Sequence, residues 1–155
     1  MTGTAQFGRY PMENKSPSTR VLRYWALLQL ADVAKDTICP AESPADTFKL
    51  FSIPVFDEIG TFSTQNGSEI GSNKFVVTEN DILVSKLNPW FSRVIYTEMD
   101  IDAVCSTEFV VWKTFGSCDE SFLFMVASSA HFRNFCIHNA TGTSNSHKRV
   151  NPEVL

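Results

Sequence analysis

Residues 74–96 read KFVVTENDILVSKLNPWFSRVIY, and their pattern indicates the fold class. Three runs within it, 74–77, 82–87 and 93–96, are rich in β-branched and aromatic residues, a composition typical of β-strands. Two groups of turn-forming residues, Glu79-Asn80-Asp81 and Asn88-Pro89, separate the runs. Residues 104–112 have the same strand composition, so we predict a core of successive strands in this part of the chain.

The residues that follow, about 119–138, change to a helical period. Apolar side chains recur there at helical spacing from Phe122 to Cys136, which predicts one long amphipathic helix of about five turns. Asp119 and Glu120 stand at its start, where the helix dipole favours acidic side chains. Gly142 is available beyond its end for a positive φ angle.

Upstream of the strands, the pattern predicts shorter elements. Residues 48–53 alternate and predict a short strand that Pro54 stops, whereas residues 57–73 predict a long polar loop. Leu30 to Lys35 predicts a short N-terminal helix, although helix and strand are nearly equally favoured there. Residues 1–19 predict a flexible arm. Together these elements predict an α+β fold with a mixed or antiparallel β-sheet core, in a single domain at 20–155.

The composition excludes several classes of protein. The chain has 155 residues, 43% of them hydrophobic and 19% charged, which excludes a disordered chain and suffices for one domain with its own core. No apolar run reaches the length of a membrane helix, about 18 residues, and no signal peptide is visible before Thr19. We therefore expect a soluble, cytoplasmic protein that has no membrane partner.

The charge is distributed unevenly along the chain. The formal net charge is −4, but no acid lies between Glu120 and Glu153, and that interval holds Arg133, Lys148, Arg149 and all three histidines. Residues 121–152 therefore have a net charge of +3 while the histidines are neutral. This asymmetry predicts a basic face on an acidic protein, and such a face suits a polyanionic partner.

The sequence contains no constellation that requires an enzyme. Ser128, Ser129 and His131 would face different directions on the predicted helix, and the chain lacks both a Gly-x-Ser-x-Gly elbow and a phosphate-binding glycine loop. Exposed turns and a helix start explain the neighbouring carboxylates, which are Asp57 with Glu58, Asp100 with Asp102, and Asp119 with Glu120. We expect no catalytic residues.

The cysteines predict neither disulfides nor a metal site. They are widely and irregularly spaced, so we expect reduced, mostly buried thiols at Cys39, Cys105, Cys118 and Cys136. The close pair of potential zinc ligands is Cys136 and His138, and zinc sites usually need a second such pair. We expect no bound metal and no cofactor.

Two polar loops contain cationic side chains, SKLNPWFSR at 85–93 and TGTSNSHKR at 141–149. In the first, Lys86 and Arg93 are candidates to neutralise phosphates, and Asn88 offers both a donor and an acceptor to a base edge. The second loop offers hydroxyls, an amide and the cations Lys148 and Arg149, with no acid among them. Taken alone, each loop is better explained as a solvated surface loop than as a nucleic-acid contact. Together, in a small domain without a catalytic set, they favour nucleic-acid binding.

Around these loops the chain resembles the specificity (S) subunits of type I restriction–modification systems. The first stretch is FSIPVFD at 51–57 followed by GSEIGSNK at 67–74, and the second is DILVSKLNP at 81–89 with Arg93-Val94. The third is CSTEFVV at 105–111, with TGTS at 141–144 and HKRV at 147–150. Trp25 to Val33 also resembles the opening of such a domain. The resemblance covers about residues 20–155.

The resemblance implies a target recognition domain, which recognises one half of a bipartite DNA site and directs methylation and cleavage by partner subunits. The implied partners are double-stranded DNA and the methyltransferase (modification) and motor (restriction) subunits. The family's subunits contain two such domains separated by long helices, so this chain is similar to one domain without the following spacer helix. A second copy or second recognition domain would then supply the other half.

The residues that we expect to contact DNA come from both loops and, for Lys74, from the end of the first stretch. They are Lys74, Lys86, Asn88, Arg93, Thr143, Ser144, Asn145, His147, Lys148 and Arg149. The alternative function is that of a non-catalytic protein-interaction or decoy remnant of such a subunit that no longer binds DNA. The net charge of −4 and the missing spacer helix motivate this alternative.

Overall fold

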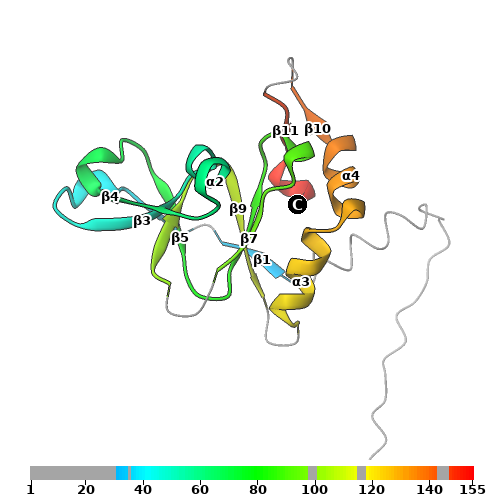
Figure 1. Cartoon of the computed structure of the whole chain (residues 1–155), viewed down its shortest axis with the longest axis horizontal. Helices are drawn as coiled ribbons and strands as arrows, with labels where there is room; N and C mark the ends of the chain where they lie inside the picture. The colour runs from blue at the N-terminus through cyan, green and yellow to red at the C-terminus, as the bar shows by residue number, and fades with distance from the viewer. Residues whose placement is uncertain (1–30, 35, 98–100, 115–117, 143–146) are drawn as a thin grey trace, which may run out of the picture.

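The computed structural model describes residues 31–34, 36–97, 101–114, 118–142 and 147–155 (Figure 1). A four-stranded antiparallel sheet has the order β1 (Ala31–Val33), β9 (Phe109–Thr114), β6 (Ile82–Ser85) and β7 (Val94–Tyr96). A five-stranded sheet has the order β2 (Thr37–Ile38), β5 (Lys74–Val77), β8 (Ala103–Cys105), β3 (Thr47–Phe51) and β4 (Ser63–Asn66). Its β3–β8 pair is parallel and its other pairs are antiparallel. The predicted α+β class with a mixed sheet core is thus confirmed.

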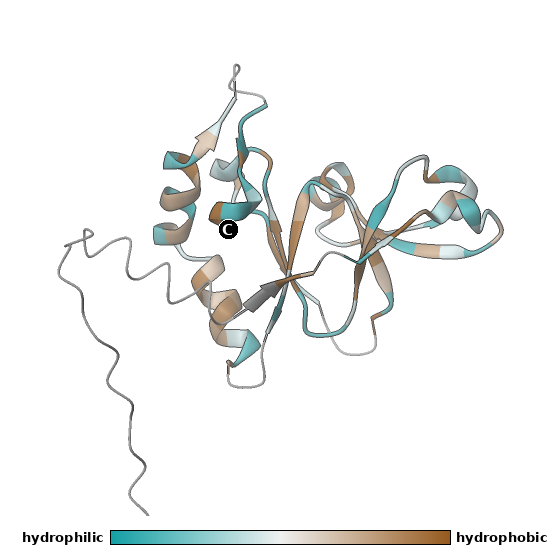
Figure 2. Ribbon diagram, turned by 180° about the vertical axis from the view of Figure 1, so that it is seen from behind, coloured by the Kyte–Doolittle hydropathy of each residue, from teal (hydrophilic) through white to brown (hydrophobic). Residues whose placement is uncertain are grey.

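The four-stranded sheet lies between the helices at 120–138 and the five-stranded sheet (Figure 1). Side chains along its strands point alternately into two hydrophobic cores, one on each face. Ile82, Val84, Val110 and Trp112 face a cluster that includes Leu123, Ala127 and Phe132 of the helices. Leu83, Phe109 and Val111 face the other cluster, with Phe51, Val77 and Cys105 of the five-stranded sheet. This alternation is the period of two that a strand with both faces buried requires. Figure 2 shows the apolar colouring along these strands and on the helices.

The predicted strand at 104–112 is two strands that belong to different sheets. Ser106 breaks the run, because its carbonyl accepts from the Phe109 amide at 3.0 Å and its hydroxyl accepts from the Glu108 amide at 3.2 Å. The chain turns there from β8 into β9. The apolar composition on both sides of the turn conceals it in the sequence. The prediction for β5 has the observed bounds, and those for β6 and β7 extend slightly too far.

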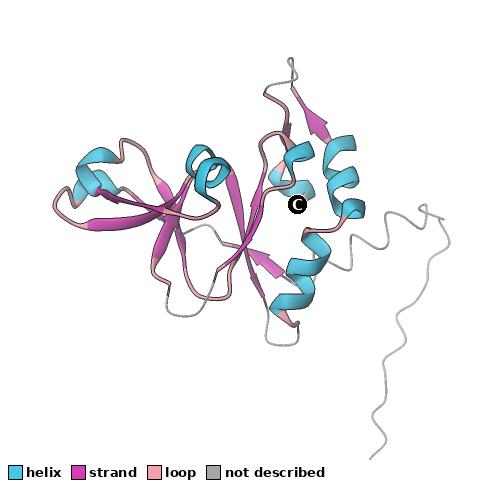
Figure 3. Ribbon diagram, in the orientation of Figure 1, coloured by secondary structure: helices cyan, strands magenta, loops and turns pink. Residues whose placement is uncertain are grey.

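The prediction of one long helix at 119–138 is wrong, because the structure has two helices. They are α3 (Glu120–Ala127) and α4 (Ala130–His138), joined by Ser128 and Ser129 (Figure 3). Ser129 has extended backbone angles, φ −70° and ψ 147°, and its hydroxyl accepts from the Phe132 amide, so it caps a new helix. The predicted start is confirmed, since Asp119 caps α3 and accepts from the amides of Ser121 and Phe122.

Two upstream predictions also differ from the structure. Ala31–Val33 forms strand β1 and not a short helix, because it pairs with β9. The predicted loop at 57–73 contains the end of α2 (Ile53–Ile59), strand β4 and the 3-10 turn η2 (Gly67–Glu69). Pro54 lies in the first turn of α2, where proline is favoured, so it marks a helix start. The predicted strand at 48–53 is β3, which ends already at Phe51.

The remaining short elements complete the edges of the fold. They are η1 (Pro40–Glu42), η3 (Pro89–Phe91), η4 (Pro152–Val154) and the antiparallel pair β10 (Ala140–Thr141) and β11 (Arg149–Val150). Gly142 has a φ of 147°, which confirms the predicted positive angle. The predicted arm at 1–19 and the start of the predicted domain lie outside the described residues. Among the described residues, no helix is both long enough and apolar enough to cross a lipid bilayer.

Candidate nucleic-acid interface

Two segments that are far apart in sequence join at one end of the four-stranded sheet. The chain leaves β6 at Lys86, and the Lys86 carbonyl accepts from the Val150 amide at 3.0 Å. Leu87 and Arg149 form an antiparallel bridge, and the Asn88 amide donates to the Lys148 carbonyl at 2.8 Å. We call residues 86–88 together with 147–150 the cationic edge. The two loops singled out in the sequence therefore meet, and backbone hydrogen bonds fix their register.

The turn between β8 and β9 adds an acid to the cationic edge. Arg149 donates through Nε and Nη2 to both carboxylate oxygens of Glu108, each at 2.9 Å. The Glu108 backbone carbonyl accepts from the Lys86 amide at 2.8 Å, which ties this turn to the same edge. The hydrogen bonds from Arg149 hold the pKa of the Glu108 carboxyl below its usual value, and the charge of Lys86 acts in the same direction. The Arg149 side chain is half exposed, so its guanidinium is oriented but still accessible.

Arg93 lies within the fold and not on its surface. Its Nε and Nη2 donate to the two carboxylate oxygens of Asp57 at 2.6 and 2.7 Å, and Nη1 donates to the Leu87 carbonyl at 3.2 Å. The Arg93 side chain is 7% exposed, whereas that of Asp57 is 47% exposed. Arg93 therefore links helix α2 to the cationic edge, and its donors are used in these internal contacts.

Lys74 is also drawn into an internal contact. It belongs to β5 of the five-stranded sheet and is buried, with Nζ donating to the Ser72 carbonyl at 2.9 Å and to the Ser72 hydroxyl at 2.6 Å. Desolvation lowers the pKa of its ammonium group. Neither Lys74 nor Arg93 therefore contributes an accessible cation to the cationic edge.

Some of the other predicted site residues lie in the described part of the chain, and some lie outside it. Asn88 has a left-handed backbone, φ 51° and ψ 68°, and its side chain is half-buried where η3 begins. Lys86 and Lys148 are half-buried and His147 is exposed. The predictions for Thr143, Ser144 and Asn145 fall outside the described residues, between Gly142 and His147.

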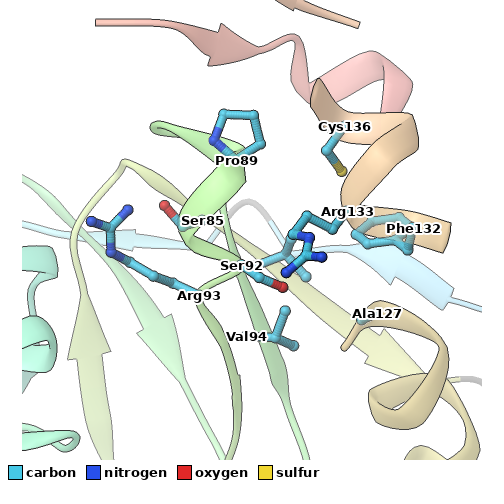
Figure 4. Close-up of a pocket in the computed structure, with 10 residues that line it drawn as sticks. Ser85, Pro89, Ser92, Arg93, Val94, Ala127, Phe132, Arg133 and Cys136 are labelled. Carbon is cyan, nitrogen blue, oxygen red and sulfur yellow. The ribbon is translucent and has the colours of Figure 1, made fainter. Parts of the chain in front are cut away.

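Helix α4 packs against η3, the 3-10 turn that directly follows residues 86–88 of the cationic edge. A cavity of about 10 Å³ separates η3 and β7 from the helices, with Ser85, Pro89 and Arg93 on one side and Phe132, Arg133 and Cys136 among the residues on the other (Figure 4). A cavity of this size holds at most one water molecule. It is therefore a packing gap and not a ligand site. Figure 4 shows the Arg93 guanidinium pointing away from Arg133, so the two do not form a joint anion site.

Reactive groups do not gather at this edge. All four cysteines are free; Cys105 and Cys136 are buried, whereas Cys39 and Cys118 are half-buried. Burial raises the pKa of both Cys105 and Cys136 to about 12. Thiols with such pKa values are poor nucleophiles and metal ligands at neutral pH. Over the described ranges, no group of three or more metal-ligating side chains comes together.

The sequence did not predict the two acidic residues that form ion pairs with Arg149 and Arg93. Glu108 and Asp57 are distant in sequence from Arg149 and Arg93, and no local pattern links them. It also missed Phe91, which projects from η3 with 60% of its surface exposed. Phe91 stands in the first cationic loop directly after Trp90, and the sequence of two adjacent aromatic residues does not indicate which of them is exposed.

The chain was compared with protein-family models, curated proteins and solved structures. No family model and no curated protein matches it. One similar structure is a chain of a type I R-M system, solved in a study of complex assembly and conformational transition. It has a TM-score of 0.69 and 21% sequence identity, over 82% of this chain and 34% of that chain.

Another similar structure is the HsdS subunit from Thermoanaerobacter tengcongensis, with a TM-score of 0.65 and 18% identity. The match covers 83% of this chain and 34% of the subunit, so this chain spans about a third of the length of its structural neighbours. At these identities the likeness shows a shared fold. The resemblance found in the sequence is thus confirmed for the fold, independently of the motifs.

Proposed function

We propose that this chain is a target recognition domain of a type I restriction–modification specificity subunit, and that it binds double-stranded DNA without catalysing a reaction. The observation that supports this most strongly is the union of residues 86–88 with residues 147–150 into one cationic edge. A fold shared with part of a specificity subunit supports it independently.

The three cations of the edge are assigned different roles from their placement. Lys86 and Lys148 neutralise backbone phosphates, which position the protein on the duplex without specifying sequence. Arg149, oriented by Glu108, presents a planar fork of donors suited to the O6 and N7 acceptors of guanine. Asn88 lies beside them. Thr143, Ser144, Asn145 and His147 stay predicted contacts to base edges.

The edge contains few cations, so the domain alone binds DNA weakly at physiological salt. Each neutralised phosphate contributes about −0.9 to the slope of log K against log salt, and a handful of contacts gives a small electrostatic term. We infer that the methyltransferase and motor subunits of the same system supply further contacts. A second copy or a second recognition domain supplies the other half of a bipartite site.

The direct test is binding of the full chain to a duplex of mixed sequence, measured by fluorescence anisotropy over a salt series. We expect binding at low salt that weakens with salt, and the Lys86→Ala/Lys148→Ala variant should lose about 1.8 from the magnitude of the slope. The matched control is Lys49→Ala. Lys49 lies on β3 of the five-stranded sheet, with Nζ 5.7 Å from the centre of the Phe62 ring.

A second candidate function is a protein-interaction or decoy module that keeps the fold but no longer binds DNA. The pairing of Arg149 with Glu108 and the net charge of −4 favour it. The salt series separates the two candidates. Absence of binding even at low salt, or binding that Lys49→Ala weakens as much as the double variant does, would reject the DNA-binding proposal.

A further inference from the structure

A large aromatic side chain is exposed next to the cationic edge. Phe91 is the last residue of η3 and 60% of its surface is exposed, whereas its neighbour Trp90 is half-buried. The two ring centres are 6.2 Å apart with the planes inclined at 48°. Single exposed apolar side chains are common on protein surfaces, but the position of Phe91 beside the proposed binding surface makes its ring available for an apolar contact with the partner.

The backbone around Phe91 is tightly constrained. Asn88 and Ser92, which flank η3, both have left-handed backbones with φ values of 51° and 50°. The Phe91 amide donates to the Asn88 carbonyl at 3.1 Å, and the Ser92 amide donates to the Pro89 carbonyl at 3.1 Å. Pro89 itself is buried against α4. Non-glycine residues in this conformation persist where the surrounding structure holds them, so η3 presents Phe91 in a fixed position.

Contacts through Arg93 place the Phe91 ring at the cationic edge. The Arg93 guanidinium carbon lies 4.6 Å from the ring centre, so it covers one face of the ring. The same guanidinium is fixed by Asp57 and donates to the Leu87 carbonyl. Leu87 in turn is bridged to Arg149. The ring therefore lies within two contacts of the segment that we expect to meet DNA.

We propose that Phe91 contacts the C5-methyl group of a thymine in the major groove and specifies that base. This inference rests on the proposed DNA-binding function. A phenylalanine inserted between base pairs would need both ring faces free, and Arg93 occupies one. The free face and edge suit a thymine methyl, for which aromatic and aliphatic side chains are known partners. Arg93 and Asp57 act as positioning residues for the ring.

The test starts from duplexes that the full-length wild-type chain selects from a randomised pool at low salt. We expect Phe91→Ala to lose a preference for thymine at one or two adjacent positions and to keep the preferences elsewhere. Its salt slope should equal that of the wild type, because no phosphate contact is removed. Replacing that thymine with uracil removes the methyl alone, and should weaken wild-type binding about four-fold while leaving Phe91→Ala unaffected.

The matched control is Met125→Ala. Met125 lies on α3 and is 61% exposed, so this variant removes an equally exposed apolar side chain away from the edge, and base preferences should not change. Thermal unfolding of both variants checks that the fold is retained.

If the wild type selects sequences and Phe91→Ala selects the same ones, the thymine contact is wrong and the DNA-binding proposal stands. If Phe91→Ala weakens binding but uracil has no effect on the wild type, the ring contacts DNA in another way, and the methyl contact is likewise overturned. If the wild type binds no duplex at low salt, the proposed function fails and this inference fails with it.

Discussion

Removing the charge of Glu108 should strengthen DNA binding. Glu108 accepts two hydrogen bonds from Arg149, both of 2.9 Å, and its carboxylate is the acid that the fold brings to the cationic edge from the β8–β9 turn. In Glu108→Gln the side chain keeps its shape but loses its charge and one acceptor. The Arg149 guanidinium is then free to reach a phosphate.

The size of the effect follows from counterion release. One additional phosphate contact steepens the salt slope by about 0.9, so binding at 50 mM salt gains roughly 3.5-fold relative to binding at 200 mM. The free energy of unfolding should fall by less than about 1 kcal/mol, because the ion pair is partly exposed, with 50% of the Arg149 side chain and 30% of the Glu108 side chain accessible. Base selectivity should decrease, since Arg149 loses the partner that orients its fork.

The assay is fluorescence anisotropy with a mixed-sequence duplex at salt concentrations between these limits. Glu42→Gln is the matched control, because it removes the same charge from the exposed turn η1 beside the five-stranded sheet. Adding Arg149→Ala to Glu108→Gln should abolish the gain. An unchanged slope in Glu108→Gln, or an equal gain in Glu42→Gln, would show that Arg149 does not gain a phosphate contact when Glu108 loses its charge.

Three further predictions concern stability. Asp57→Ala leaves the buried Arg93 guanidinium without its carboxylate, so urea unfolding should show a loss of about 2 kcal/mol, and a loss below about 0.5 kcal/mol would contradict the buried pair. Ser129→Ala removes the cap of α4 and should cost about 1 kcal/mol by the same measurement, whereas Ser128→Ala, outside the cap contact, should cost little. Hydrogen bonds from Arg93 and Arg149 lower the pKa values of Asp57 and Glu108 below 3.8 and 4.5, respectively. The two ion pairs therefore contribute fully to the free energy of unfolding above pH 4.5, and this contribution is lost as the pH falls through the lowered pKa values of the folded state. Unfolding midpoints should therefore decrease below about pH 4.5, and they should do so less in Asp57→Asn.

The strands of the central sheet were predictable because burial on both faces leaves a clear composition. Ile82, Leu83 and Val84 are apolar without interruption, as expected for a strand covered by helices on one face and a sheet on the other. The two serines that end one element and start another were harder to recognise in the sequence. Ser129 caps a helix and Ser106 turns the chain, yet each stands in an apolar run whose period dominated the prediction.

The candidate site was predictable as two loops but not as a set of side chains. The polar and cationic composition of the loops identified the segments that join at the cationic edge. It could not identify which cations remain accessible, because that depends on Asp57 and Glu108, which tertiary structure brings from distant positions. Arg93 was therefore expected to contact DNA, whereas the structure places it between α2 and the Leu87 carbonyl.

A nuclear magnetic resonance titration of the isotope-labelled full chain with a selected duplex would show whether both segments of the cationic edge meet DNA. We expect the backbone amides of residues 86–88 and 147–150 to shift together and to saturate at the same duplex concentration. Saturating shifts confined to the five-stranded sheet or to α3, or shifts in only one of the two segments, would contradict this expectation.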